Sequence, residues 1–340
     1  MNFLTTLQAV ALFLLAMIGI PNFAVASAVS VQGSGASFPA PLYQRWIAEF
    51  VKIHPDIQIN YQSIGSGAGV KNLTAGLVDF AGSDAAMTDQ EISGVSRGVV
   101  MIPATAGSIV LAYNLPNIAS LRLSRVAYVG IFLGKITQWS DPAIAATNPG
   151  VQLPNLPIIV VTRSDGSGTT FAFTKHLSDI DPEFSRTVGF HKSVAWPTGM
   201  AGKGNDGVTA LLKQTPGAIG YIEYGYAHHN HIPFATLQNK SGNYVTATIA
   251  SGLAALSHAS LPANLRGWPS DPPGAEDYPI ATFTWLLLYK KYNDLEKLTA
   301  LKKFVSYGLT TGQSFSEDLG YLPLPPDIVK KAQAILETVH

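Results

Sequence analysis

The sequence contains no cysteine, so the chain can form no disulfide bond and offers no thiolate nucleophile, cysteine metal ligand or cysteine for lipid attachment. It also lacks a charge excess, because 22 Lys and Arg residues balance 22 Asp and Glu residues and no basic stripe runs along the chain. This balance argues against nucleic acid as the main partner. A neutral protein that binds an anion must rely on local geometry rather than on a broad positive field.

Long apolar runs are also missing after the first 28 residues, and no later segment is long and apolar enough to span a bilayer. Residues 1–28 carry no charged side chain, Leu7–Ile20 is almost wholly apolar, and small residues at 24–28 offer a cleavage site, although no Lys or Arg precedes the apolar run. A membrane anchor and a buried helix are the alternatives, but the apolar run is shorter than the roughly 18–20 residues of a spanning helix. We predict that residues 1–28 are a cleaved secretory signal peptide.

The rest of the chain alternates strand-like and helix-like segments, which is typical of an α/β protein with a largely parallel sheet. Its length allows about two domains or lobes of roughly 100–200 residues. The expected strands are Val29–Gln32, Ile57–Tyr61, a segment around Phe80, Val99–Pro103, Ser108–Tyr113, Pro157–Thr162, Ala218–Ile222 and Phe283–Tyr289. The expected helices are Pro41–Ile53, Val70–Leu77, a segment opened by the capping box Thr88–Glu91, Ser124–Leu133, Gly166–Leu177, Gly207–Lys213, Leu295–Tyr307 and Asp327–Val339.

Three loops combine glycine with hydroxyl side chains, and each one runs into a segment with a helical pattern: Gly33–Phe38, Gly65–Gly69 and Arg163–Thr169. In an open α/β sheet, ligands bind beyond the carboxyl ends of the strands, where helix N-termini point. A single loop of this kind is more often a simple turn. Three of them, one with an arginine, predict a cage for a small oxyanion, built from two lobes that face each other across a cleft.

A tetrahedral oxyanion must recover from the protein the hydrogen bonds that it loses with its water shell. Arg163 would supply a permanently charged, bidentate donor, and Asp165 would orient its guanidinium group. The other donors would be the backbone N–H groups of Ser37, Phe38, Gly168 and Thr169 and the hydroxyl groups of Ser37, Ser66, Ser167 and Thr169.

Asp84 is the acid expected to face the anion directly. A carboxylate that faces an anion gains a hydrogen bond only if the anion carries a proton, as phosphate does near neutral pH and sulfate does not. A site built around a ligand OH group can reject an analogue without it by roughly 10⁴–10⁵-fold. Asp84 therefore favours phosphate over the alternative oxyanions sulfate and molybdate.

These motifs resemble those of the periplasmic phosphate-binding proteins of phosphate ABC transporters, and the resemblance spans nearly the whole chain after residue 28. The segments that carry it are Gly33–Pro41, Tyr61–Val70, Val78–Asp84, Arg163–Thr169, Gly202–Gly207 and Pro216–Tyr224. The resemblance implies a periplasmic-binding-protein type II fold, with two α/β lobes, a central cleft and a hinge. The implied phosphate-binding residues are Ser37, Phe38, Ser66, Asp84, Arg163, Ser167, Gly168 and Thr169.

The resemblance also implies the division of the chain and its partners. Residues 29–111 and 281–340 would form lobe 1 and residues 112–280 lobe 2, with the hinge near Leu111–Asn114 and Tyr278–Thr282. The protein would be a periplasmic monomer without cofactor or metal that delivers phosphate to the membrane permease subunits of the importer. Position 37 departs from the family pattern, because Ser replaces the common Thr but keeps the hydroxyl group.

Other residues and motifs suggest alternative functions. Gly202–Gly207 is not a nucleotide-binding P-loop, because Gly204 stands where Ser or Thr is required, and a turn before a helix is the better account. The tract His228–His231 has no nearby Cys or Asp to complete a metal site. An enzyme acting on phosphoesters is the rival function, but there is no Gly-x-Ser-x-Gly elbow and no second catalytic partner for Asp84. A secreted phosphate scavenger that works without a transporter stays open as an added role.

Overall fold

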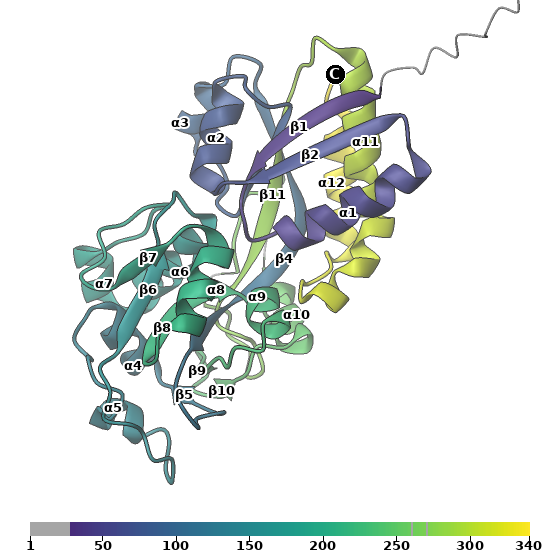
Figure 1. Ribbon diagram of the computed structural model, residues 1–340. Coiled ribbons are helices and arrows are strands. Elements are labelled where there is room, and N and C mark those ends of the chain that lie inside the picture. Colours follow the sequence, from purple (N-terminus) through teal and green to yellow (C-terminus); the bar gives the residue numbers. More distant parts are fainter. Residues whose placement is uncertain (1–27, 260, 270) are drawn as a thin grey trace, which may run out of the picture.

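The computed structural model describes residues 28–259, 261–269 and 271–340 (Figure 1). The predicted signal peptide therefore lies outside the described residues, except for Ala28. Within the described part of the chain, none of the helices has the length and apolar character needed to cross a membrane.

An eight-stranded mixed sheet runs through the whole molecule in the order β2-β1-β3-β11-β4-β8-β6-β7, and a small sheet has the order β10-β9-β5 (Figure 1). The strands are β1 (Val29–Gly35), β2 (Ile57–Ser63), β3 (Phe80–Ser83), β4 (Val99–Tyr113), β5 (Arg122–Leu123), β6 (Ile159–Arg163), β7 (Met200–Gly202), β8 (Ala218–Glu223), β9 (Thr236–Gln238), β10 (Tyr244–Val245) and β11 (Ala281–Tyr289).

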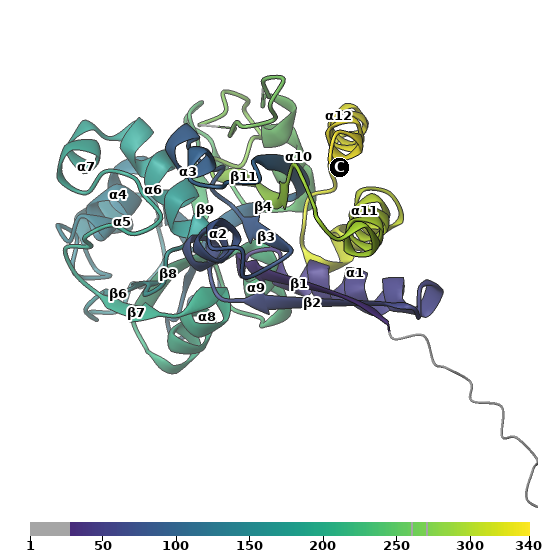
Figure 2. The same cartoon turned by 90° about the horizontal axis from the view of Figure 1, so that it is seen from above.

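Helices follow most of the strands and pack on the large sheet. In Figure 2, α1 lies beside β1 and β2, and α12 lies on the far side of α11, which contacts both α1 and α12. The helices are α1 (Ala40–Ile53), α2 (Ser66–Thr74), α3 (Asp89–Ser93), α4 (Arg125–Phe132), α5 (Pro142–Ala145), α6 (Gly168–Ile180), α7 (Pro182–Thr187), α8 (Gly204–Gln214), α9 (Tyr224–His229), α10 (Ile249–Ser257), α11 (Leu295–Leu309) and α12 (Pro326–Glu337), with short 3-10 helices at Thr311–Phe315 and Glu317–Leu319.

Strand β4 joins the two ends of the large sheet, because its pairing partner changes along its length. Val99–Ser108 pairs with β11, and Ile109–Tyr113 pairs with β8, both in antiparallel register. Figure 1 shows the elements on either side of β4 as two bodies. We call β1–β3 with α1–α3, α11 and α12 the first half, and β5–β10 with α4–α9 the second half. The lobe boundaries at residues 111/112 and 280/281 stay a prediction.

The structure confirms the α/β architecture but corrects the expected sheet. Only its flanks are parallel, where β1 pairs with β2 and β3, and β6 pairs with β7 and β8. The centre is antiparallel because β4 and β11 run between the two halves in opposite directions. The two strands expected at Val99–Pro103 and Ser108–Tyr113 are one strand of 15 residues, because the small buried residues 104–107 continue it.

Two buried tryptophans tie α1 and β11 to segments distant in the sequence. Trp46 of α1 is 1% exposed, and its indole N–H donates to the carbonyl of Gly312 at 2.8 Å. Trp285 of β11 is fully buried and donates to the carbonyl of Leu265 at 2.9 Å. A buried indole N–H without such a partner would carry a desolvation penalty. These contacts hold α1 and β11 in place, and both elements adjoin the candidate site described below.

His176 of α6 is a buried titratable group in the second half, with 4% of its surface exposed. Its Nε2 atom lies 3.0 Å from the hydroxyl of Tyr128. Burial lowers the pKa of His176 from its ordinary value of 6.5 to about 4, because the charged imidazolium is poorly solvated there.

We expect His176 to make the folded state acid-sensitive. The unfolded chain takes up this proton near pH 6.5 but the folded chain only near pH 4, so stability is complete above pH 6.5 and falls as the pH drops to about 4. The loss should be about 3 kcal/mol. Denaturant unfolding of the wild type and of His176→Gln between pH 4 and 7 would measure it, since the glutamine side chain does not titrate. Equal pH slopes for the two proteins would contradict this prediction.

Candidate functional site

The residues predicted to bind an oxyanion lie together where the two halves meet. The three Gly/Ser loops follow β1, β2 and β6 and lead into α1, α2 and α6. All eight of the predicted residues are buried, and Arg163 is 7% exposed. They are Ser37, Phe38, Ser66 and Asp84 from the first half and Arg163, Ser167, Gly168 and Thr169 from the second half.

Ser66 forms a direct polar link between the halves. Its Oγ atom accepts hydrogen bonds from the backbone N–H of Gly168 at 3.0 Å and of Asp84 at 3.3 Å. A second link runs from the backbone N–H of Gly67 to the carbonyl of Gly166 at 2.7 Å. A Cβ atom on Gly168 would lie 2.6 Å from both the Ser66 Oγ atom and the Asp84 Cβ atom, so only glycine permits this approach.

The guanidinium of Arg163 is fixed in a buried ion pair. Its Nε and NH2 atoms donate to the two carboxylate oxygens of Asp165 at 2.8 and 2.6 Å, as the sequence predicts, and NH1 donates to Thr169 Oγ1 at 3.2 Å. Burial pushes the pKa of Asp165 upward, but the hydrogen bonds and charge of Arg163 outweigh it, so the net pKa is lowered. A guanidinium has five N–H groups, so two of them remain for a ligand.

Asp84 is 1% exposed and lies at the end of β3 beside Ser66. Its Oδ1 atom accepts a hydrogen bond from the Thr284 hydroxyl at 2.8 Å, and its Oδ2 atom lies 3.5 Å from Ser66 Oγ. Burial raises the pKa of Asp84 to about 7, although the Thr284 hydrogen bond and the charge of Arg163 oppose this rise. The carboxyl group can therefore exchange a proton near neutral pH. Thr284 was not predicted, because nothing in the β11 sequence marks it.

Asn205 is a second residue that the sequence analysis missed. It lies in the first turn of α8, is fully buried, and donates through Nδ2 to Ser37 Oγ at 3.0 Å and to Thr169 Oγ1 at 3.3 Å. The segment Gly202–Gly207 leads into a helix, as predicted, but α8 begins at Gly204 rather than at Gly207, so only Lys203 separates it from β7. Asn205 follows β7 at the carboxyl end of a parallel strand, where ligands bind in open α/β sheets. This position is the sequence signal that could have assigned Asn205 to the site.

Phe38 and Ser167 support the loops in which they lie. The Phe38 carbonyl accepts a hydrogen bond from the Tyr321 hydroxyl at 2.7 Å, and its buried ring lies 6.2 Å from that of Tyr321. The Ser167 hydroxyl caps α6 by accepting from the backbone N–H of Thr170 at 2.9 Å. The cap fixes the start of α6 at the site. The positive end of the helix dipole then favours a negative charge there.

Two ion pairs link α3 to segments outside the first half. Glu91 pairs with Lys192, and Asp89 pairs with Arg266 at 2.6 Å. Glu91 also completes the predicted capping box of α3, because its carboxylate accepts from the backbone N–H of Thr88. These pairs border a pocket of about 750 Å³ that begins at Ala85, next to Asp84, so they lie at the outer edge of the site.

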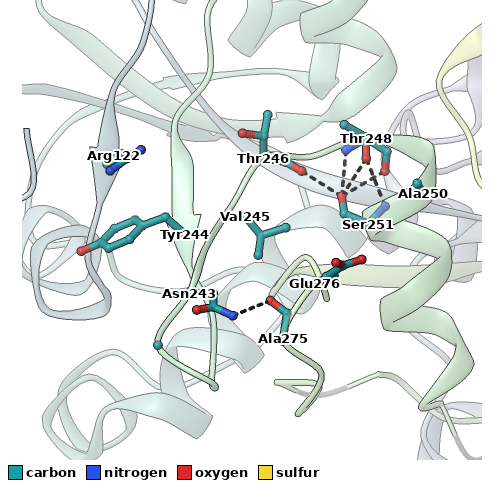
Figure 3. Close-up of a pocket in the computed structure, with 11 residues that line it drawn as sticks. Arg122, Asn243, Tyr244, Val245, Thr246, Thr248, Ala250, Ser251, Ala275 and Glu276 are labelled. Carbon is teal, nitrogen blue, oxygen red and sulfur yellow. Dashed lines mark hydrogen bonds between the residues drawn. The ribbon is translucent and has the colours of Figure 1, made fainter.

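A separate pocket of about 650 Å³ lies between the small sheet and α10 (Figure 3). Two of its polar residues bond to neighbouring groups, since Ser251 bonds within the capping box of α10 and the Asn243 amide donates to the Ala275 carbonyl. Across the described residues, moreover, no group of three or more His, Asp or Glu side chains is arranged to hold a metal ion. The candidate functional site is therefore the polar cluster between the halves.

Comparison with known proteins identifies the family. The PBP superfamily domain matches residues 22–310. The phosphate-binding protein PstS of Pasteurella multocida is 39% identical over 315 residues, which cover 92% of this chain and 91% of that protein. Its counterpart from Haemophilus influenzae is 40% identical over 317 residues, which cover 92% and 94%. The chain belongs to this PstS family.

Solved structures show that the fold is also that of the periplasmic binding proteins, as expected. A high affinity periplasmic phosphate-binding protein, PfluDING, solved with bound phosphate, aligns with a TM-score of 0.74 over 90% of this chain and 93% of its own. It is 21% identical, so this likeness concerns the fold alone. A phosphate-binding protein from Stenotrophomonas maltophilia aligns with a TM-score of 0.71 at 20% identity, over 90% of this chain and 94% of its own.

We expect Gly168→Ala to separate the two halves of this PstS family member, because the new methyl group would collide with Ser66 and Asp84. Small-angle X-ray scattering should give a larger radius of gyration for Gly168→Ala than for the wild type. Gly94→Ala is the matched control, because its Cβ atom would meet nothing closer than 3.4 Å. A Gly168→Ala protein as compact as the wild type would show that the halves tolerate the methyl group.

Proposed function

We propose that the protein captures inorganic phosphate between its two halves and delivers it to the permease of an ABC-type importer. Membership of the PstS family supports this function. The observation that carries it is the buried Asp84 carboxyl, with a pKa of about 7, set among hydroxyl and N–H donors beside the Arg163 guanidinium. The proposed ligand residues are Ser37, Phe38, Ser66, Asp84, Arg163, Ser167, Gly168 and Thr169.

The proposed selectivity comes from a shared proton. A phosphate oxygen that carries a proton can donate it to Asp84, and the remaining oxygens accept from Arg163 and from the N–H groups at the start of α6. Sulfate has no proton to offer, so its oxygen would face the Asp84 carboxylate without a hydrogen bond. In a buried site, two acceptors that face each other without a hydrogen bond reduce the binding free energy.

Closure of the two halves would couple binding to transport. Ser66 lies in the first half and Arg163 in the second, so only the closed arrangement brings both to one anion. Phosphate should therefore shift an open-to-closed equilibrium toward the closed form. We further propose that the protein is exported to the periplasm, acts there as a monomer, contacts the permease subunits when closed, and catalyses no reaction.

The selectivity can be measured by calorimetric titration with phosphate and with sulfate. The wild type should bind phosphate tightly and sulfate negligibly. In Asp84→Asn, the amide N–H can donate to an unprotonated oxyanion, so the ratio of phosphate to sulfate affinity should fall by at least about tenfold, or about 1.4 kcal/mol.

Asp79→Asn is the control, since Asp79 pairs with Lys297 in the same half of the molecule. This variant should keep the wild-type ratio. Comparable phosphate and sulfate affinities in the wild type would remove the role proposed for Asp84.

We expect Arg163→Ala to weaken phosphate binding on the order of 100-fold. The variant loses the two charged N–H donors and leaves the Asp165 carboxylate without its partner beside the anion. Arg125→Ala is the control, because Arg125 forms a comparable bidentate pair with Asp271 elsewhere in the molecule. Unchanged phosphate affinity in Arg163→Ala would place the site elsewhere.

A further inference from the structure

Asn205 is fully buried and contacts predicted ligand residues from both halves. Its backbone N–H and its Nδ2 atom both donate to Ser37 Oγ, each at 3.0 Å. Nδ2 also donates to Thr169 Oγ1 at 3.3 Å. One amide side chain of α8 thus connects a hydroxyl of the first half with a hydroxyl of the second half.

The orientation of this amide is fixed by its third partner. Its Oδ1 atom accepts a hydrogen bond from the backbone N–H of Glu223 at 3.0 Å. A backbone N–H can only donate, so the amide oxygen must face Glu223 and the amide nitrogen must face the two hydroxyl groups. Asn205 therefore acts as a donor toward both Ser37 and Thr169.

These contacts determine what the two hydroxyl groups can still do. A hydroxyl oxygen has two acceptor positions and one hydrogen to donate. Ser37 Oγ accepts twice from Asn205, and Thr169 Oγ1 accepts once from Asn205 and once from Arg163 NH1. Both acceptor positions of each oxygen are thus filled, and within the described residues neither hydroxyl hydrogen is bonded to a protein acceptor.

We propose that Asn205 is a positioning residue that makes Ser37 and Thr169 obligate donors to the bound anion. The inference rests on the phosphate-binding function proposed above. A free hydroxyl could turn its lone pairs toward an anion, whereas a hydroxyl whose acceptor positions are filled can present only its hydrogen. Asn205 would in this way convert two neutral groups into donors without adding charge, and its bond to Ser37 would exist only when the halves are closed.

The first test compares phosphate affinity in Asn205→Leu and in Val208→Ala by calorimetry. Leucine has the branched shape of asparagine but cannot hydrogen-bond, so affinity should fall on the order of 10–100-fold. Val208 is fully buried in the same helix and touches neither hydroxyl group, so it controls for a weakened α8. An equal loss in both variants, or wild-type affinity in Asn205→Leu, would overturn the proposal.

A double-mutant cycle separates positioning from general support of the fold. If Asn205 acts through the Ser37 hydroxyl, the affinity loss caused by Asn205→Leu should shrink at least about threefold in a Ser37→Ala background. The same fold-loss in both backgrounds would refute the inference. Wild-type protein that bound no phosphate would refute the proposed function itself, and the two failures are therefore distinguishable.

A direct measurement needs no variant and so does not depend on whether Asn205→Leu folds. Neutron diffraction from deuterated wild-type crystals grown with phosphate should locate the deuterium atoms on Ser37 Oγ and Thr169 Oγ1. We expect both to point at a phosphate oxygen, with the two amide deuterium atoms of Asn205 pointing at the hydroxyl oxygens. A hydroxyl deuterium directed toward Asn205 would overturn the proposal.

Discussion

The contact between Ser66 and Gly168 is the interaction on which the arrangement of the site depends. The 3.0 Å hydrogen bond brings the start of α6 against the start of α2, and no side chain larger than that of glycine fits at position 168. The contact also encloses Asp84, and enclosure is what raises the pKa of that carboxyl to about 7. The arrangement of the site and the raised pKa of Asp84 thus have one cause, which is the close approach of the two halves at Ser66 and Gly168.

Charge at the site is controlled locally, in keeping with the neutral composition of the chain. Arg163 and Asp165 neutralise each other, and burial raises the pKa of Asp84 to about 7, which reduces the average negative charge of this carboxyl near neutral pH. The attraction for an anion must therefore come mainly from oriented dipoles, which include the start of α6 and the hydroxyl groups that Asn205 contacts. Such dipoles discriminate by direction, which a diffuse positive field cannot do.

Much of this could be predicted from the sequence. Glycine and hydroxyl residues before helices marked the three loops, and Asp84 and Arg163 stood out as isolated charges beside them. Asn205 and Thr284 could not be found in this way, because they reach the site through the tertiary fold, from α8 and from β11. The antiparallel centre of the sheet was missed for a related reason: local periodicity carries no information on strand direction. The lobe boundaries and the roles of the eight predicted ligand residues remain predictions.

Strand β4 has a mechanical consequence for any opening of the molecule. Its first ten residues belong to one ladder and its last five to another, so a single stretch of backbone is common to both halves. Covalent geometry lets such a strand flex or twist but not lengthen. An opening motion would therefore be a rotation of one half relative to the other about β4. A sliding displacement would have to break interstrand hydrogen bonds along β4.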